Sequence, residues 1–280
     1  MAEHPAATPA SDAPQTLEGH FVLHDAYAVM WPYWLAQAPQ ERSAIITEAV
    51  GWLQDETGVG QLHSALYSLL GQKGDLMLIH YRKNVDALNR TERSFKRLRL
   101  FQFLKPVYSY FSVIEASLNE ATAIAQHKIT DRGLAPGSAE YAEALEVEMT
   151  AQRKALESRV FRFIPENRYL CFYPMSKRRG DKHNWYALRP EERRGLMRGH
   201  GRIGHKYHRE VVQVIGGSIG FDDWEWGVSL HADQPLVFKK LISEMRFDPA
   251  SSLYAEFGPF WFGIRQQPDD LAVLFAGGLA

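Results

Sequence analysis

The sequence predicts an α+β fold made of two ferredoxin-like modules, each with the element order β-α-β-β-α-β. Apolar and polar residues alternate in several short segments, and other segments repeat their apolar residues at helical spacing. The order of these segments in residues 17–118 recurs in residues 159–280. Because an open sheet needs its apolar face covered, we expect the two sheets, or neighbouring subunits, to pack in a dimeric α/β-barrel arrangement.

The composition is typical of a globular protein from a reducing compartment. The chain has 280 residues, of which 45% are hydrophobic, enough to bury one large core or two smaller ones. A formal net charge of -1 argues against a general nucleic-acid binder, and Cys171 alone cannot form an internal disulfide. No apolar run approaches bilayer length, so we predict a cytoplasmic protein without a membrane span.

The first module is predicted to occupy residues 17–118, after a disordered tail over residues 1–16 that is rich in Ala, Pro, Ser and Thr. Helices are expected at residues 39–57, where Gly58 stops the helix, and at residues 84–104, which Pro106 closes. Strands are expected at residues 20–31, 62–70, 75–81 and 108–118, with a tight turn between the middle two.

Residues 119–158 interrupt this pattern and are predicted to form a helical connecting arm or a lid. The second module then occupies residues 159–280. One of its helices begins at Pro190, and the other is expected to be capped by Asp233. Its strands are expected at residues 168–176, 211–219, 223–231 and 253–264.

A histidine in the second module is the first candidate for chemistry. His200 lies on an apolar helical stripe, where an imidazole needs a hydrogen-bond partner or a metal. A core histidine bonded to a carbonyl is the commoner case. A zinc site with His205 and His208 is a weak alternative, because His200 and His205 lie roughly 140° apart around the helix axis. A single axial imidazole fits better, since the helix also carries glycines that would let a large flat ligand approach.

Other side chains predict an anionic ligand beside this histidine. Tyr173 and Lys177 share one face of their strand, which runs into the basic segment 177–183. A buried aromatic residue and a snorkelling lysine would be the ordinary alternative. Trp185 could cover an apolar ring, and Gln213 needs a buried partner or a ligand. Arg246 and Ser251 could hold another anion, and Arg159 opens the strand region upstream. These residues together predict a planar ligand with several anionic groups and an iron centre, such as a porphyrin with propionates.

The chain resembles the coproheme decarboxylases, the haem-synthesising branch of the chlorite dismutase-like family. The resemblance rests on residues 173–177 (Tyr-Pro-Met-Ser-Lys), residues 184–186 (Asn-Trp-Tyr), the pair His200-Gly201, Gln213 and residues 220–227. It continues through residues 238–240, 244–248 and 256–258. The match is dense over the second half and looser over the first half, where only the order of elements corresponds.

The resemblance implies a homopentamer of two-module subunits with the porphyrin site in the second module. His200 matches the family's axial iron ligand, Tyr173 its radical-forming tyrosine, and Lys177 the lysine beside that tyrosine. Arg246 is expected to support a propionate. The positions that match porphyrin contacts are Arg159, Tyr173, Pro174, Met175, Ser176, Lys177, Gln213 and Ser251.

The family reaction converts iron-coproporphyrin III, which is both substrate and redox centre, into haem b. Hydrogen peroxide drives two oxidative decarboxylations, which turn the 2- and 4-propionates into vinyls and release carbon dioxide. The resemblance implies that a Tyr173 radical removes a hydrogen atom from the propionate β-carbon, while Lys177 accepts or donates the coupled proton. It also implies a transient contact with the coproporphyrin ferrochelatase.

Two other functions stay open. A chlorite dismutase-like haem peroxidase would act on a different substrate, but Gln213 is neutral where chlorite dismutases carry a distal arginine. A non-catalytic haem carrier or sensor would need the axial ligand and the propionate contacts. Such a carrier would have no use for the oxidisable phenol of Tyr173.

Overall fold

The computed structural model describes residues 15–57 and 63–276, so most of the predicted tail over residues 1–16 lies outside the described residues. The chain divides into two compact units. The smaller unit comprises the chain up to Glu18 together with residues 115–160, and the larger one comprises residues 19–114 and 161–280. No helix of the described residues is long and apolar enough to cross a membrane.

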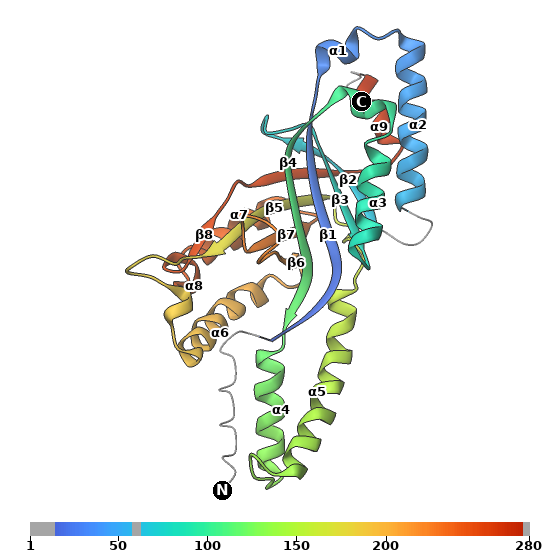
Figure 1. Cartoon of the computed structure of the whole chain (residues 1–280). Coiled ribbons are helices and arrows are strands. Elements are labelled where there is room, and N and C mark those ends of the chain that lie inside the picture. The colour runs from blue at the N-terminus through green and yellow to red at the C-terminus, as the bar shows by residue number, and fades with distance from the viewer. Residues whose placement is uncertain (1–14, 58–62, 277–280) are drawn as a thin grey trace, which may run out of the picture. The chain divides into compact units, whose positions relative to one another are not determined.

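One antiparallel sheet runs through the larger unit (Figure 1). Its strand order is β7-β6-β4-β1-β3-β2-β9-β5-β8, and β5 pairs with β7 as well. The sheet therefore closes into a barrel, and β9 and β8 pair with successive parts of the same edge of β5. The strands are β1 (Thr16–Val29), β2 (Ser64–Leu70), β3 (Leu76–Arg82), β4 (Leu104–Ser117), β5 (Tyr169–Lys177), β6 (Val212–Gly217), β7 (Trp226–Ala232), β8 (Ala255–Phe257) and β9 (Trp261–Gln266).

The two halves of the barrel have the same topology, which confirms the predicted α+β fold. In the first half the strands lie in the order β4-β1-β3-β2, and in the second half in the order β9-β5-β7-β6. Both are the ferredoxin-like order, in which the first strand lies between the fourth and the third. The halves are joined where β2 pairs with β9 and where β4 pairs with β6, so neither module has free sheet edges there.

Helices cover the outer face of the first half. The longest, α2 (Pro39–Thr57), has the predicted bounds and buries Ile45, Ile46, Ala49 and Leu53 against the strands. The C-terminal helix α9 (Asp270–Ala276), which was not predicted, packs on the same core and lies beside α2 in Figure 1. The indole of Trp34, in α1 (Trp31–Leu35), donates to the Phe275 carbonyl at 3.0 Å. The last helix of the chain thus completes the core of the first module.

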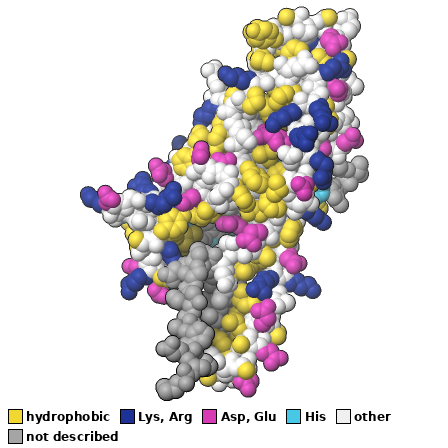
Figure 2. All heavy atoms as spheres, viewed as in Figure 1, with side chains coloured by type: hydrophobic (Ala, Val, Ile, Leu, Met, Phe, Trp, Pro, Cys, Tyr) yellow, Lys and Arg dark blue, Asp and Glu magenta, His cyan; other side chains and the backbone are white. Residues whose placement is uncertain are grey.

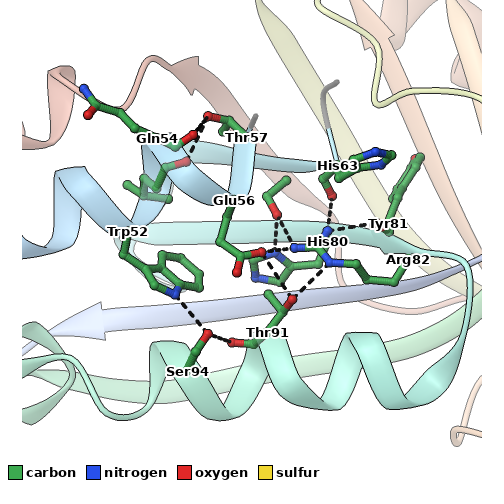
Figure 3. A network of polar contacts seen from close by, with 12 residues as sticks. Trp52, Gln54, Glu56, Thr57, His63, His80, Tyr81, Arg82, Thr91 and Ser94 are labelled. Carbon is green, nitrogen blue, oxygen red and sulfur yellow. Dashed lines mark hydrogen bonds and ion pairs between the residues drawn. The ribbon is translucent and has the colours of Figure 1, made fainter. Parts of the chain in front are cut away.

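Arg82, at the end of β3, ties together both ends of the segment between α2 and β2 (Figure 3). Its guanidinium donates to the Glu56 carboxylate near the end of α2 and to the His63 carbonyl at 2.8 Å. It also donates to Ser64 Oγ at 3.0 Å and to Thr91 Oγ1 of α3 (Val85–Phe95) at 3.0 Å. This fan of bonds uses the fixed fork geometry that only arginine offers.

The predicted helix over residues 84–104 is too long. The structure has α3 up to Phe95, a 3-10 turn η1 (Arg99–Phe103) and then β4, which begins at Leu104. In a straight helix Leu98, Leu100, Phe101 and Phe103 would point around most of the circumference. The break lets Leu100 and Phe103 reach the core while Leu98 and Phe101 pack at its edge.

Two further predictions in the second half are wrong. The strand predicted over residues 253–264 is divided into β8 and β9 at Gly258 and Pro259, where proline has no N–H for a ladder. A Cβ on Gly258 would lie 2.7 Å from Pro174 Cγ, so only glycine fits this approach. Asp233 does not cap α7 (Leu236–Met245); instead it accepts the backbone N–H of Arg168 at 3.0 Å, beside the start of β5.

The smaller unit is built around a helical hairpin. Its helices are α4 (Asn119–Asp131) and α5 (Ala139–Val160), and residues 133 and 137 of the connection are glycines with positive φ. Leu118, Ala125 and Met149 form its buried core. Ion pairs from Lys128 and Arg132 to Glu148 link the two helices on the outside.

Candidate functional site

The helix that carries His200 packs over the second half of the barrel, but its side chains stay at least partly exposed. No side chain of α6 (Pro190–Lys206) is fully buried, whereas α7 beside it buries Val237, Phe238 and Leu241. Three α7 side chains pack on β5 and β7, but the apolar stripe of α6 stays half exposed. A helix normally buries such a stripe against another surface, so the stripe of α6 is incompletely packed within this chain.

His200 is oriented by an acid. Its Nδ1 lies 2.8 Å from Oδ2 of Asp248, which is buried, while 28% of the His200 side chain is exposed. A carboxylate only accepts hydrogen bonds, so Nδ1 carries the proton and Nε2 keeps its lone pair. This is the arrangement in which an imidazole binds a metal, with its second nitrogen held by a carboxylate.

The short helix α8 (Pro249–Ser252) carries partners for both His200 and Lys177. Asp248 directly precedes α8, and Ser251 Oγ lies 3.4 Å from His200 Nδ1 and 3.4 Å from Asp248 Oδ2. Between them, the Ala250 carbonyl accepts a hydrogen bond from Lys177 Nζ at 3.2 Å. The imidazole and the amine, which the sequence places on different elements, are therefore fixed by one turn of helix.

The side chain of Lys177 is partly buried, and its amine lies over an aromatic ring. Its Nζ is 4.2 Å from the ring centre of Trp185, which belongs to η2 (Trp185–Ala187). Burial lowers the pKa of Lys177 to about 8, against the opposing charges of Asp248 and Glu225. An amine with this pKa is partly deprotonated near neutral pH, whereas an ordinary surface lysine is almost fully protonated.

Tyr173 is buried among aromatic rings on the same strand. Its ring stacks on Phe260 with centroids 4.5 Å apart and lies 5.8 Å from Phe257. The Arg246 guanidinium lies 4.0 Å from the centre of the Phe257 ring. Burial raises the pKa of the Tyr173 phenol above its ordinary value, with Arg246 acting in the opposite direction. The phenol thus stays protonated at neutral pH.

Gln213 lies on the same face of the sheet but is exposed. β6 pairs with β7 so that Ile215 lies opposite Val228, and β5 places Tyr173 opposite Val228. Residues directly opposite each other in antiparallel strands share a face. Val228 is buried, but Ile215 is 37% exposed and Gln213 is exposed as well. The β6 end of this face is therefore uncovered.

The remaining predicted residues fall into two groups. Pro174, Met175 and Ser176 lie in β5 between Tyr173 and Lys177, with Pro174 and Ser176 buried and Met175 half buried. Ser176 Oγ accepts the N–H of Glu225 at 3.2 Å. Arg159 belongs to the smaller unit, where it is exposed near the end of α5. The predicted contact of Arg159 with the ligand stays a prediction.

The glycines of α6 do not all face open space. A Cβ on Gly199 would lie 3.8 Å from Asp248 Oδ1, and one on Gly204 would lie 3.5 Å from Met245 Cε. Only Gly201 of these three has no neighbour within 4 Å. The zinc alternative gains nothing either, because within residues 15–57 and 63–276 no three His, Cys, Asp or Glu side chains could share a metal ion.

Sequence reasoning missed two residues of the site, Asp248 and Glu225. Both are buried acids, which need hydrogen-bond partners. Asp248 stands directly before a proline that starts a helix, and Glu225 directly precedes β7, within the segment where the sequence alternates it with Gly227 and Ser229. A carboxylate on a predicted inward face indicates a buried acid with a hydrogen-bond partner. The sequence does not show which residue that partner is.

The arrangement fits a flat ligand with several acidic groups. The imidazole offers a free nitrogen next to a half-exposed apolar stripe. In the part of the chain that the structure describes, no ion pair engages the cations Lys177, Arg178, Arg179, Lys182 and Arg246. Lys and Arg side chains gather on this end of the larger unit, at the left of Figure 2. Free cations around an apolar surface suit carboxylates on an aromatic ring.

Comparisons with known proteins agree on one family. The profile of the chlorite dismutase family matches residues 42–266. A protein of Natronomonas pharaonis, provisionally named as haem-binding, is 40% identical over 273 residues, which are 96% of this chain but 42% of that protein. This chain thus spans less than half the length of that relative.

Solved structures show the same fold. A novel haem-binding protein from Thermus thermophilus is 34% identical, with a TM-score of 0.78 over 95% of this chain and 98% of that one. A variant of chlorite dismutase from Candidatus Nitrospira defluvii is 18% identical, with a TM-score of 0.69 over 92% of this chain and 96% of that one. At this lower identity the likeness concerns the fold alone.

Proposed function

Because the chain belongs to the chlorite dismutase family, we propose that it binds an iron porphyrin and acts as a coproheme decarboxylase. The observation that carries the proposal is the role of α8, which holds the partners of His200 and Lys177 together. The names of the two more similar relatives support haem binding. The buried phenol of Tyr173 supports a catalytic role, since a carrier does not need it.

Binding would use the chain's own groups as follows. His200 Nε2 would bind the iron, with the imidazole held in orientation by Asp248 and Ser251. Arg246 and the basic residues from Lys177 onward contact the propionates, and Trp185 holds the Lys177 side chain in place. The bound iron supplies the oxidising power that hydrogen peroxide delivers. The substrate is iron-coproporphyrin III, and the product is haem b.

Tyr173 would carry out the hydrogen abstraction. Its phenol gives up an electron and a proton, and the resulting radical removes one hydrogen atom from a propionate β-carbon. Each propionate then becomes a vinyl group with release of carbon dioxide, while one peroxide is reduced to two waters. Because burial keeps the phenol protonated, its oxidation requires a nearby base. Lys177, with a pKa of about 8, is the group that takes up or returns this proton.

Chlorite chemistry is the weaker alternative. Gln213 is neutral, so this position offers no charge to a chlorite-derived anion. A haem carrier or sensor is the stronger alternative, because it needs His200 and the cations but no reaction. We extend the proposal to a cytoplasmic homopentamer that transiently contacts the coproporphyrin ferrochelatase. Analytical ultracentrifugation of the protein alone tests the pentamer, and the same measurement with the ferrochelatase added tests the contact between the two enzymes.

One experiment separates these functions. Purified protein is mixed with iron-coproporphyrin III and hydrogen peroxide, and the porphyrin is analysed by mass spectrometry. A decarboxylase yields the three-propionate intermediate and then stoichiometric haem b. A carrier returns coproheme unchanged or bleached, and a chlorite-degrading enzyme instead evolves oxygen from chlorite.

A further inference from the structure

Glu225 lies where the ladder between β5 and β7 ends. This ladder runs from Tyr169 opposite Ala232 to Met175 opposite Trp226, the first residue of β7. Lys177 is two residues further along β5 and has no β7 residue opposite it. Instead, Oε2 of Glu225 accepts the backbone N–H of Lys177 at 2.7 Å. The carboxylate thus replaces a carbonyl of the missing strand.

The Glu225 side chain is itself fixed. Only 8% of the residue is exposed, so its carboxylate needs partners within the protein. Its own backbone N–H donates to Ser176 Oγ at 3.2 Å, and the Tyr186 hydroxyl forms a hydrogen bond with its side chain. A buried acid held at this place has little freedom to move away from Lys177.

The same acid affects the charge at the far end of Lys177. The Lys177 amine donates to the Ala250 carbonyl and lies over the face of Trp185, and the contact with the ring favours the positive form. Glu225 and Asp248 favour that form by their charge, whereas burial disfavours it. Removal of one of these two charges therefore shifts the balance toward the neutral amine.

We propose that Glu225 is a positioning residue that sets both the place and the charge of Lys177. The bond to the backbone N–H fixes the point from which the side chain starts. The negative charge keeps more of the amine in its positive form than burial alone would allow. The catalytic meaning of this arrangement rests on the proposed decarboxylase function, but the arrangement itself does not.

The titration of Lys177 tests the proposal without any porphyrin. The full chain is labelled with carbon-13 at the lysine ε-carbon, and Lys177→Arg assigns the signal by NMR. Glu225→Gln keeps an oxygen acceptor but removes the charge, so the Lys177 midpoint should fall by about 0.5–1 pH unit with the Trp185 ring-current shift retained. Glu225→Ala should lower the midpoint and also lose the ring-current shift.

A matched control lies near the other end of the same strand. Asp233 accepts the backbone N–H of Arg168, as Glu225 accepts that of Lys177. Asp233→Asn should leave both the midpoint and the ring-current shift of Lys177 unchanged. An unchanged midpoint in Glu225→Gln would overturn the charge effect. A retained ring-current shift in folded Glu225→Ala would overturn the positioning.

Turnover then tests the catalytic part. The rate of haem b formation is measured against pH in the wild type and in Glu225→Gln. The part of this profile that follows the titration of Lys177 should lie at lower pH in Glu225→Gln than in the wild type. The difference should equal the difference between the two NMR midpoints. A profile that stays in place while the midpoint moves would overturn a catalytic role. If the wild type makes no haem b at all, the decarboxylase proposal fails, and the NMR titration still decides the role of Glu225.

Discussion

The Nδ1 atom of His200 lies 2.8 Å from Oδ2 of Asp248, although 48 residues separate them in the sequence. The bond fixes the tautomer of the imidazole, so that Nε2 keeps its lone pair. Asp248→Asn replaces the carboxylate with a neutral amide and should weaken porphyrin binding roughly 10- to 100-fold, as the loss of an outer partner of a metal ligand does. Titration with iron-coproporphyrin III measures this effect. Ser251→Ala, which keeps the acid, should change binding far less.

Arg246 should distinguish the substrate from the product. Its guanidinium makes no ion pair among the described residues and lies over Phe257, next to the Tyr173 ring. Arg246→Ala should speed coproheme dissociation by roughly ten-fold, because a charge-assisted contact is worth about 1.5–3 kcal/mol before solvent screening reduces it. Haem b, with two fewer carboxylates, should be affected less. Equal acceleration for both porphyrins in stopped-flow transfer experiments would contradict a propionate contact.

Arg82 should contribute more to stability than any exposed arginine. It forms a mostly buried ion pair with Glu56, and its removal leaves that carboxylate without its charge partner. Arg82→Ala should reduce the free energy of unfolding by about 3–5 kcal/mol. Arg99 is the matched control, since it pairs with Glu41 and Glu48 but is 43% exposed. Arg99→Ala should cost about 1 kcal/mol or less by urea denaturation. Similar losses for both variants would contradict this assignment.

Acid should destabilise the barrel through its buried histidines. Burial lowers the pKa of His24, His80 and His231 to about 3. Below about pH 6.5 these histidines bind protons in the unfolded chain but stay neutral in the folded chain. Their neutral form therefore contributes its full stability above pH 6.5, and this contribution is lost as pH falls toward 3. The loss at pH 5 is on the order of 2 kcal/mol for each histidine. Asp25, whose pKa burial raises to about 6, opposes this trend with a smaller effect.

His231→Phe tests this pH dependence. Both ring nitrogens of His231 are buried and form no hydrogen bond within the described residues, so phenylalanine removes the titration without breaking a bond. The difference in the free energy of unfolding between pH 7 and pH 5 should shrink by on the order of 2 kcal/mol. A difference as large as that of the wild type would show that His231 does not titrate on unfolding.

The sequence predicted the fold well where the local pattern and the tertiary packing agree. The bounds of α2 followed from its apolar stripe and from Gly58, and the repeated element order revealed the two modules. Prediction failed where tertiary contacts override the local pattern. Leu100 and Phe103 bend the chain into η1 so that both enter the core, and the approach of Gly258 to Pro174 divides the last predicted strand.

The site was predictable only in part for a related reason. Alternation along β5 put Tyr173 and Lys177 on one face, and helical spacing singled out His200. Their partners come from distant segments, because both His200 with Asp248 and Lys177 with Glu225 are 48 residues apart. No local pattern shows which acid such a residue will meet. The ligand roles of Arg159 and Gln213 stay predictions.

The conversion of coproheme by Tyr173→Phe tests the central claim most directly. If the phenol only packs or donates a hydrogen bond, its loss costs on the order of 1 kcal/mol, roughly five-fold in binding, and turnover continues. If the phenol is the hydrogen-abstracting group, the variant binds iron-coproporphyrin III with unaltered His200 ligation but makes no three-propionate intermediate with peroxide. Mass spectrometry of the porphyrin after peroxide addition distinguishes the two results. Our account predicts unreacted coproheme, and near-normal formation of haem b would contradict it.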